Sequence, residues 1–321
     1  MNFNLVLDQW IPVKTRQGNR KCIAAWEVTA NISEDPIISL DFPRADLNAG
    51  MIQFFIGLIQ TCLLPDSVFQ WEEYKNNIPD PGFLYECLRK ESDAFEFSGD
   101  GPRFMQDLTL HTEEKKNKSH IRGLFIDEPG DNTLKNNTDF FVKRGRIETI
   151  CPACAAAALY TLQANAPSGG QGNRTSLRGG GPLTTIVLGN NLWETIWFNV
   201  LERIQLESLP CDPERPRIGG CYPWMAPTQT SEEGQKTNPS QKHPLHVFWA
   251  MPRRIRLIFH NREDAVCDVC GKETDHIVAE YWGKNYGYNY TGPWEHPLTP
   301  YTRQNQNEPN PIKGSPAGIR Y

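Results

Sequence analysis

Residues 151–165 read CPACAAAALYTLQAN, and residues 267–273 read CDVCGKE. In each stretch two residues separate a pair of cysteines, and this spacing lets one tight turn direct both sulfur atoms at a single metal ion. Zinc favours four thiolates arranged as a tetrahedron. The two pairs therefore predict one structural zinc site, formed by Cys151, Cys154, Cys267 and Cys270.

The long interval between the pairs indicates what such a site would do. More than one hundred residues separate Cys154 from Cys267, so the metal would join two distant parts of a larger domain. Four thiolates leave no open position for water, which predicts a structural and not a catalytic ion. Gly271 follows the second pair, where the turn needs a residue that tolerates a positive φ.

A zinc-dependent nucleobase deaminase is the alternative interpretation of the first pair. Such enzymes use His-x-Glu followed by Pro-Cys-x-x-Cys, with the glutamate as acid and base, and His111-Thr112-Glu113 precedes Cys151. Ile150 stands where that motif has proline, and the second cysteine pair would have no role. The motif details therefore favour the structural site.

Length and composition are those of a globular protein. The chain has 321 residues, of which 39% are hydrophobic and 22% charged. It contains neither a membrane-spanning apolar run nor a secretory signal, and its nine cysteines are an odd number, so we expect a cytoplasmic protein with reduced thiols and no membrane partner. The net charge of -5 argues against a protein that coats nucleic acid nonspecifically.

The pattern of apolar residues predicts an α+β fold, in the form of one large, mixed and irregular domain that holds the four-cysteine zinc knuckle site. Residues 4–13 alternate apolar and polar side chains and predict a strand that leads into a hairpin through RQGNRK. Asp46 is the expected N-cap of an apolar helix that ends before Pro65. The alanine-rich stretch after Cys151 predicts a second helix that stops at Pro167.

The remaining segments are less regular in composition. Residues 65–105 predict short elements around aromatic side chains, and residues 107–138 predict a long polar loop. PLTTIVL, residues 182–188, predicts a strand, and residues 206–243 predict a long surface insertion. HVFWAMPRRIRLIF, residues 246–259, predicts paired strands that lead to the second cysteine pair.

A glycine-rich loop follows the alanine-rich helix. Residues 168–181 contain six glycines with Arg174 and Arg178, and such a loop lets main-chain amides approach a phosphate or a groove. It lacks the Gly-Lys-Ser/Thr of a nucleotide-binding loop, and here the helix precedes the glycines. By itself the composition of the loop favours a flexible connector. We expect His243, His246 and His296, which lie beside prolines or aromatic residues, to be structural.

Seven blocks occur in one order along the chain: LVLDQWIPV, SLDFPRADL, FMQD, CPACAAAALYTLQANAP, SLRGGGPLTT, CDVCGKE and GPWEHPLTPY. Together they resemble the CasA family, the large subunit of the type I-E CRISPR surveillance complex Cascade. The resemblance covers nearly all 321 residues. It implies that residues 1–321 form the N-terminal globular domain of such a subunit; the C-terminal helical bundle of the family, and the hairpin before it, are not among these residues.

The resemblance implies an antiviral assembly protein without a catalytic role of its own. Guide RNA pairing would read the target sequence, while this subunit would read the protospacer-adjacent motif in double-stranded DNA and help to open the duplex. The implied partners are the other Cascade subunits, the guide RNA, the target DNA and the effector helicase-nuclease. A third alternative is a scaffold that holds zinc and contacts only protein.

The resemblance also implies which residues contact nucleic acid. In the family a glycine loop enters the minor groove beside the motif, and its counterparts here are Ser168, Gly169, Gly170, Gln171, Gly172, Asn173 and Arg174. A family lysine that reaches the same groove corresponds to Lys284 in YWGKNYGY. A family loop that contacts the guide RNA or a neighbouring subunit corresponds to Phe140, Phe141, Val142 and Lys143 in DFFVKRGR. By holding the helix after Cys151 to the segment before Lys284, the zinc would fix the DNA-contacting elements relative to each other.

Overall fold

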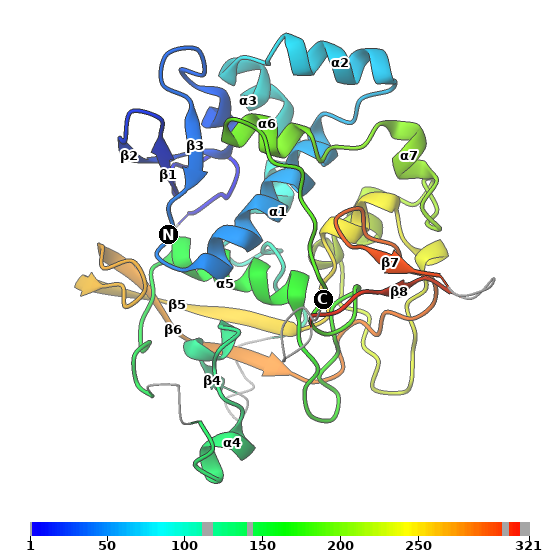
Figure 1. Cartoon of the computed structure of the whole chain (residues 1–321). Coiled ribbons are helices and arrows are strands. Elements are labelled where there is room, and N and C mark those ends of the chain that lie inside the picture. The colour runs from blue at the N-terminus through cyan, green and yellow to red at the C-terminus, as the bar shows by residue number, and fades with distance from the viewer. Residues whose placement is uncertain (1, 111–117, 140–143, 304–307, 315–321) are drawn as a thin grey trace.

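A computed structural model describes residues 2–110, 118–139, 144–303 and 308–314. Figure 1 shows a mixed architecture, with a small sheet near the N-terminus, two central helices and a long antiparallel hairpin beneath them. The α+β prediction is confirmed.

The N-terminal sheet contains β1 (Ile11–Thr15), β2 (Arg20–Ile23) and β3 (Ile37–Leu40) in the order β2-β1-β3, and both pairings are antiparallel. The predicted hairpin is confirmed, but the prediction that its first strand begins at residue 4 is wrong. The Asn4 side chain accepts hydrogen bonds from the amides of Val6 and Leu7 at 3.1 and 3.2 Å. These bonds make residues 4–7 a turn that buries Leu5 and Val6, and Asn4 makes one isolated bridge, to Glu96.

Helix α1 (Ala45–Cys62) crosses the centre of the molecule and ends before Pro65, as predicted. Its N-cap is Arg44, so the prediction that Asp46 fills that position is wrong. Asp46 lies in the first turn, where its carboxylate pairs with the Arg44 guanidinium at 2.7 Å. The negative charge still lies at the positive end of the helix dipole.

Short elements surround α1. The other helices are α2 (Val68–Asn76), α3 (Pro81–Arg89), α4 (Asp131–Lys135), α5 (Pro152–Asn165), α6 (Leu192–Trp197) and α7 (Arg203–Glu207). The 3-10 segments are η1 (Ala25–Thr29), η2 (Ser92–Phe95), η4 (Ile121–Leu124), η6 (Pro223–Met225), η7 (Pro239–Gln241) and η8 (Pro244–Phe248), and η5 (Arg217–Cys221) is one wider turn. The short elements predicted for residues 65–105 are confirmed.

The second sheet contains β4 (Lys118–His120), β5 (Arg254–Val266) and β6 (Glu273–Lys284) in the order β4-β6-β5, with both pairings antiparallel. The second cysteine pair lies in the turn that joins β5 to β6. The loop predicted for residues 107–138 is wrong for β4, η4 and α4. Polar KSH has little strand propensity of its own, and it is extended because the open edge of β6 offers it main-chain partners.

The strand predicted for residues 182–188 is wrong, and so is the surface position predicted for part of residues 206–243. Residues 182–188 form no strand, because their main chain makes one isolated bridge, from Pro182 to Lys313, and single hydrogen bonds to Ile312 and Leu298, which do not add up to a ladder among the described residues. Within the part of the chain that the structure describes, strands β7 (Tyr301–Thr302) and β8 (Asn310–Pro311) pair only with each other. Residues 206–243 are irregular as expected, yet Tyr222 and Trp224 are buried in the core.

The core is built around the ring of Phe54 on α1. Six aromatic rings have centroids 5.5–6.2 Å from it, in edge-to-face geometry: those of Trp10, Phe55, Phe95, Phe104, Tyr160 and Trp249. These residues come from segments throughout the chain, including α5. The core therefore fixes α1 and α5 against each other and holds α5 over the β5–β6 hairpin (Figure 1).

Candidate metal centre and nucleic-acid interface

The first cysteine pair forms the beginning of α5. Cys151 is the N-cap, and its sulfur accepts a hydrogen bond from the amide of Cys154 at 3.4 Å. Pro152 occupies the first helical position, where its missing N–H costs nothing. The CPAC sequence therefore starts the helix and turns both sulfur atoms to the same side.

The second pair lies in a tight turn between β5 and β6. Gly271 has φ of +70°, and its amide donates to the carbonyl of Cys267 at 2.8 Å, so the predicted positive φ is confirmed. The Asp268 carboxylate accepts hydrogen bonds from the amides of Glu148 and Thr149, both at 2.7 Å. This aspartate ties the second turn to the segment just before Cys151, independently of any metal.

The four sulfur atoms converge as predicted. All lie within 4.8 Å of one another, and those of Cys151 and Cys270 are 3.8 Å apart. Zinc–sulfur bonds of about 2.3 Å at tetrahedral angles place the sulfur atoms about 3.8 Å from one another. The cysteine set can therefore hold a metal ion, and its spacing fits zinc.

The close packing of the four thiols favours binding of a cation. Hydrogen bonds with the Cys151 and Cys154 thiols lower the pKa of Cys270 to about 7. Hydrogen bonding to Cys151 and Cys267 instead raises the pKa of Cys154. Because adjacent thiolates repel one another, all four ionise together only around a positive charge.

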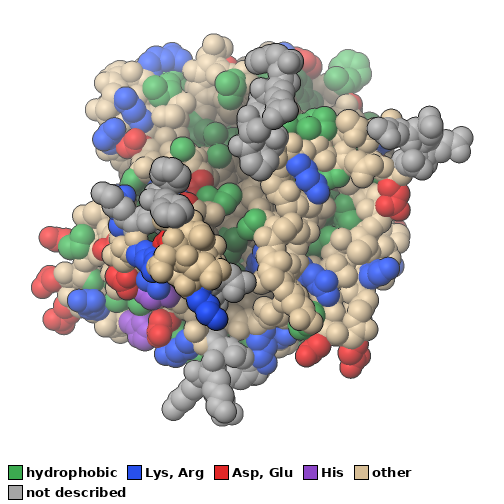
Figure 2. Space-filling view, turned by 60° about the horizontal axis from the view of Figure 1, so that its bottom comes forward, with side chains coloured by type: hydrophobic (Ala, Val, Ile, Leu, Met, Phe, Trp, Pro, Cys, Tyr) green, Lys and Arg blue, Asp and Glu red, His purple; other side chains and the backbone are tan. Residues whose placement is uncertain are grey.

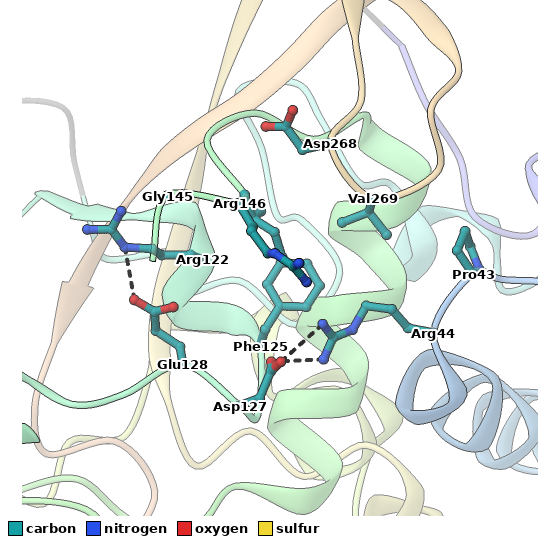
Figure 3. Close-up of a pocket in the computed structure, with 11 residues that line it drawn as sticks. Pro43, Arg44, Arg122, Phe125, Asp127, Glu128, Gly145, Arg146, Asp268 and Val269 are labelled. Atoms are coloured by element: carbon teal, nitrogen blue, oxygen red, sulfur yellow. Dashed lines mark hydrogen bonds and ion pairs between the residues drawn. The ribbon is translucent and has the colours of Figure 1, made fainter. Parts of the chain in front are cut away.

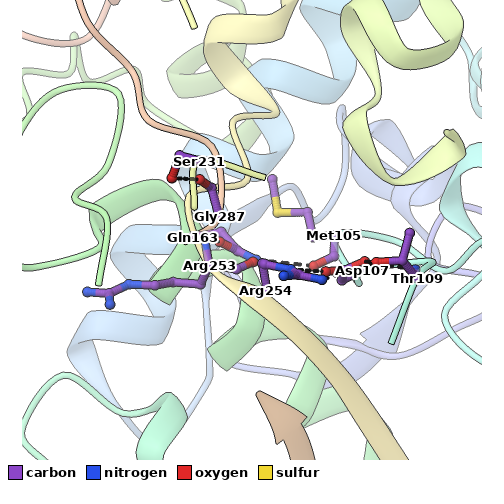
Figure 4. Close-up of polar contacts among 8 residues, drawn as sticks. All are labelled: Met105, Asp107, Thr109, Gln163, Ser231, Arg253, Arg254 and Gly287. Atoms are coloured by element: carbon purple, nitrogen blue, oxygen red, sulfur yellow. Dashed lines mark hydrogen bonds and ion pairs between the residues drawn. The ribbon is translucent and has the colours of Figure 1, made fainter. Parts of the chain in front are cut away.

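Helix α5 runs from the cysteine cluster to the glycine loop, alongside β6. At the cluster end Ile150 and Val278 exchange two main-chain hydrogen bonds, of 3.0 and 2.8 Å. At the other end the Gln163 side chain donates to the carbonyl of Arg253 and accepts from its amide, both at 2.9 Å (Figure 4). The helix is about 20 Å long, so the cysteines fix one end of this unit and Gln163 fixes the other.

The glycine loop is seated on the chain that follows Lys284. The amide of Tyr286 donates to the carbonyl of Gly172, and the Asn285 side chain donates to the carbonyl of Gln171, both at 2.8 Å. Gly172 has φ of +77°, and an added Cβ would lie 2.8 Å from that of Asn285, so only glycine fits. The structure thus brings together the two segments that were predicted to contact DNA.

The predicted residues of this loop differ in their surroundings. Ser168, Gly169, Gly170, Gln171 and Asn173 are exposed, whereas Gly172 and Lys284 are half-buried. The Arg174 guanidinium is directed inward, donating to Ser231 Oγ at 2.8 Å and lying 5.6 Å from the centroid of the Tyr286 ring. Arg174 therefore holds the loop in place, and the exposed edge consists of main chain with Gln171 and Asn173.

Polar contacts beneath the loop reinforce this arrangement (Figure 4). Arg253 donates to the carbonyl of Pro167 at 2.6 Å, at the point where the loop leaves α5. The next residue, Arg254, forms a buried ion pair of 2.6 Å with Asp107 of the FMQD block. Burial acts to raise the pKa of Asp107, but hydrogen bonds from Arg254 and Thr109 outweigh it and hold that pKa below its usual value.

Comparison with known proteins agrees with this geometry. The family model for CRISPR-associated protein Cse1 matches residues 4–321.

The chain belongs to the Cse1 family.

Solved structures support the same fold. Cse1 of Thermobifida fusca matches with a TM-score of 0.65 and 19% identity, over 94% of this chain and 55% of that one. CasA (Cse1) of Thermus thermophilus matches with a TM-score of 0.64 and 19% identity, over 98% and 58%. A chain of a CRISPR RNA-guided surveillance complex matches with a TM-score of 0.67 and 15% identity, over 99% and 63%. This Cse1-family chain thus spans about three fifths of the length of the structures it matches, and the CasA resemblance is confirmed.

Some sequence predictions for this Cse1-family chain lie outside the described residues. These are the guide RNA or subunit contacts Phe140, Phe141, Val142 and Lys143, together with His111 and Glu113 of the deaminase alternative. The cysteine geometry nevertheless bears on that alternative. Since Cys267 and Cys270 complete a four-thiol set, the cluster needs no histidine ligand.

Sequence reasoning missed the residue that anchors the far end of the glycine loop. Arg178 is 2% exposed and donates to Gln53 Oε1 and Asn165 Oδ1, both at 2.8 Å, and to the carbonyl of Ala164 at 3.3 Å. It makes no ion pair with any carboxylate of the described residues. Its charge instead faces the last carbonyls of α5, where the helix dipole is negative. The only signal in the sequence was an arginine beside three glycines, which does not distinguish a buried side chain from an exposed one.

Two of the predicted structural histidines are confirmed as such. His246 and His296 are buried, and burial lowers the pKa of each well below its usual value. Among the described residues, no helix is both long and apolar enough to cross a membrane.

Proposed function

We propose that this Cse1-family chain is the part of a CRISPR RNA-guided surveillance complex that recognises the short motif beside the target in double-stranded DNA. Guide RNA, the neighbouring subunits and the effector helicase-nuclease would be its other partners, in the cytoplasm. The family match and the likeness to a chain of such a surveillance complex support this role. In this role the chain would recognise the motif and help to open the duplex, and it would catalyse no reaction itself.

One observation carries the proposal: the exposed edge of loop 168–174 is held beside Lys284 by the bonds from Asn285 and Tyr286. Minor-groove patterns are degenerate, so a reader of that groove needs close main-chain approach and a few donors. Four of the seven loop residues have side chains no larger than that of serine, which permits such an approach. Gln171, Asn173 and Lys284 would supply the donors.

The net charge of -5 is compatible with this role. Most of the electrostatic affinity of a DNA-binding assembly comes from neutralised phosphates, and other subunits of the complex can supply those contacts. The chain would then contribute selectivity for the motif more than overall affinity.

We further propose that the ion in the cysteine cluster is zinc and that it is structural. Four thiols this close together can complete a tetrahedral shell, and a bound ion would hold the start of α5 against the turn between β5 and β6. The loop itself lies at the other end of α5, so the metal positions it through the helix.

The test is binding of target duplexes by the reconstituted complex carrying Gln171→Ala, Asn173→Ala and Lys284→Ala together. Each lost base-edge contact costs about 1–3 kcal/mol, so affinity for the preferred motif should fall at least about tenfold. The matched control is Gln205→Ala, Asn76→Ala and Lys90→Ala, which removes the same side-chain types from exposed positions elsewhere. It should bind like the unaltered complex.

Affinity that is unchanged across a library of motifs in the first variant would refute the assignment. Footprinting the duplex with and without this chain distinguishes the protein-only scaffold, which would leave the footprint at the motif unaltered.

A further inference from the structure

A groove opens beside the glycine loop, between η4, the end of α5 and the end of β6. We call it the β6 groove; its volume is about 290 Å³, and Asn173 of the loop and Lys284 line it. Small-molecule sites typically occupy about 300–1,000 Å³, so the space suits one flat ring system with its attachments. Figure 2 shows the face that comes forward from the β4 side, where a central hollow contains hydrophobic side chains and is bordered by Lys and Arg.

Two glycines let an aromatic ring lie close against the main chain in this groove. Tyr281 of β6 lines it, and so do Gly123 of η4 and Gly283 of β6. An added Cβ at Gly123 would lie 2.7 Å from Tyr281 Oη, and one at Gly283 would lie 3.2 Å from Tyr281 Cε2. Because neither position carries a side chain, the Tyr281 ring can lie directly against the main chain of η4 and β6, which fixes the ring where it lines the groove.

Polar groups of the β6 groove complement a nucleotide. Asn173 and Asn285 present side-chain amides, which both donate and accept as the edges of bases do. Arg253 also lines the groove, and its Nε is a buried donor without a hydrogen-bond partner among the described residues. The groove thus combines a ring, amides and cationic groups, as single-stranded nucleic-acid sites do.

The charge balance distinguishes this groove from the larger cavity of about 440 Å³ beside the second cysteine pair. That cavity is lined by as many carboxylates as guanidiniums, and Figure 3 shows Asp127 and Glu128 engaged by Arg44 and Arg122. In the β6 groove Arg254 is neutralised by Asp107 and Glu128 is paired with Arg122, which leaves Arg253 and Lys284 as the further charged residues of its lining. An excess of positive charge favours a phosphate-bearing occupant over an acidic or neutral peptide.

We propose that the β6 groove receives one unpaired nucleotide of the target DNA, with its base stacked on Tyr281 and its phosphate near Arg253. The inference rests on the proposed function, because a nucleotide becomes unpaired only where the duplex is opened beside the motif. Unstacking a base costs a few kcal/mol. Stacking on an aromatic side chain offsets a comparable amount, so the groove would help to hold the duplex open.

The experiment places 5-iodouracil, which crosslinks to aromatic side chains under ultraviolet light, at successive positions beside the motif in target duplexes bound by the reconstituted complex. A crosslink to the Tyr281 peptide is expected from one or two adjacent positions. Tyr281→Leu should abolish it, Tyr281→Phe should retain it, and Ser119→Trp, which fills the groove from β4, should lower it at least about tenfold. Ser240→Trp makes the same exchange at an exposed serine outside the groove and should leave it unchanged.

The outcomes separate the two proposals. If the unaltered complex binds the duplex but no position crosslinks to Tyr281, the nucleotide inference is overturned and motif recognition stands. If the complex assembles but does not bind duplex at all, motif recognition fails and the inference fails with it. If Ser119→Trp instead prevents assembly while Ser240→Trp does not, the groove seats a protein subunit and the inference is overturned.

Discussion

Replacing Arg178 by methionine tests whether its hydrogen bonds outweigh the cost of burying its charge. Methionine has a similar length but offers no donor. The change leaves Gln53 Oε1, Asn165 Oδ1 and the carbonyl of Ala164 without the donor they share. Each buried acceptor that loses its partner costs about 1–3 kcal/mol.

The magnitude follows from these two opposing effects. Three acceptors give a gross loss of about 3–9 kcal/mol, and removing a buried guanidinium returns part of it. We therefore expect a net loss near the lower end, about 3 kcal/mol. By the usual scaling with chain length, that loss lowers the melting temperature of a 321-residue chain by roughly 4–5 °C.

The assay is urea unfolding followed by tryptophan fluorescence, with calorimetry as a second probe. Arg89→Met is the matched control, because Arg89 is exposed and pairs only with Glu86; its effect should stay below about 1 kcal/mol. The double variant Gln53→Met with Arg178→Met should lose less free energy of unfolding than the two single variants added together. Methionine at position 53 leaves no buried acceptor there without a donor.

An unchanged or higher unfolding midpoint for Arg178→Met would refute this reasoning. It would mean that burial of the guanidinium costs as much as its five hydrogen bonds contribute, the other two being to Thr184 and Thr299.

Three further predictions follow from the metal centre and the buried ionisable groups. Cys267→Ser should release the ion, so metal analysis should fall from about one zinc per chain to a small fraction, with lower thermal stability. Asp107→Asn leaves Arg254 buried without its carboxylate and should cost about 3–5 kcal/mol in chemical unfolding; an effect below about 1 kcal/mol would contradict the role given to the pair. His246 and His296 have folded-state pKa values below those of the unfolded chain, so the unfolded state binds protons first as the pH falls. Below about pH 6.5 stability should therefore decrease by up to about 1.4 kcal/mol per pH unit for each histidine, and a flat midpoint between about pH 7.5 and 5.5 would contradict this.

The sequence alone determined the parts whose physics is local. Two residues between paired cysteines direct both sulfur atoms at one point, and Gly271 supplies the positive φ that the second turn needs. Pro152 and Cys151 start α5 by their own backbone and side-chain chemistry, and Pro65 bounds α1. The order of the sequence blocks was enough to recognise the family.

Only the tertiary structure decided the rest, because it depends on partners distant in the chain. Lys118–His120 is a strand because β6 has an open edge, whereas the apolar PLTTIVL forms no strand because the described residues beside it provide an isolated bridge and single main-chain bonds instead of a ladder. Arg178 is buried because α1 and the end of α5 meet around it. The cysteine pairs, separated by more than one hundred residues, become one site because Ile150 pairs with Val278 and Asp268 caps Thr149. The same packing carries the glycine loop to Lys284 at the far end of α5, a juxtaposition that local spacing cannot specify.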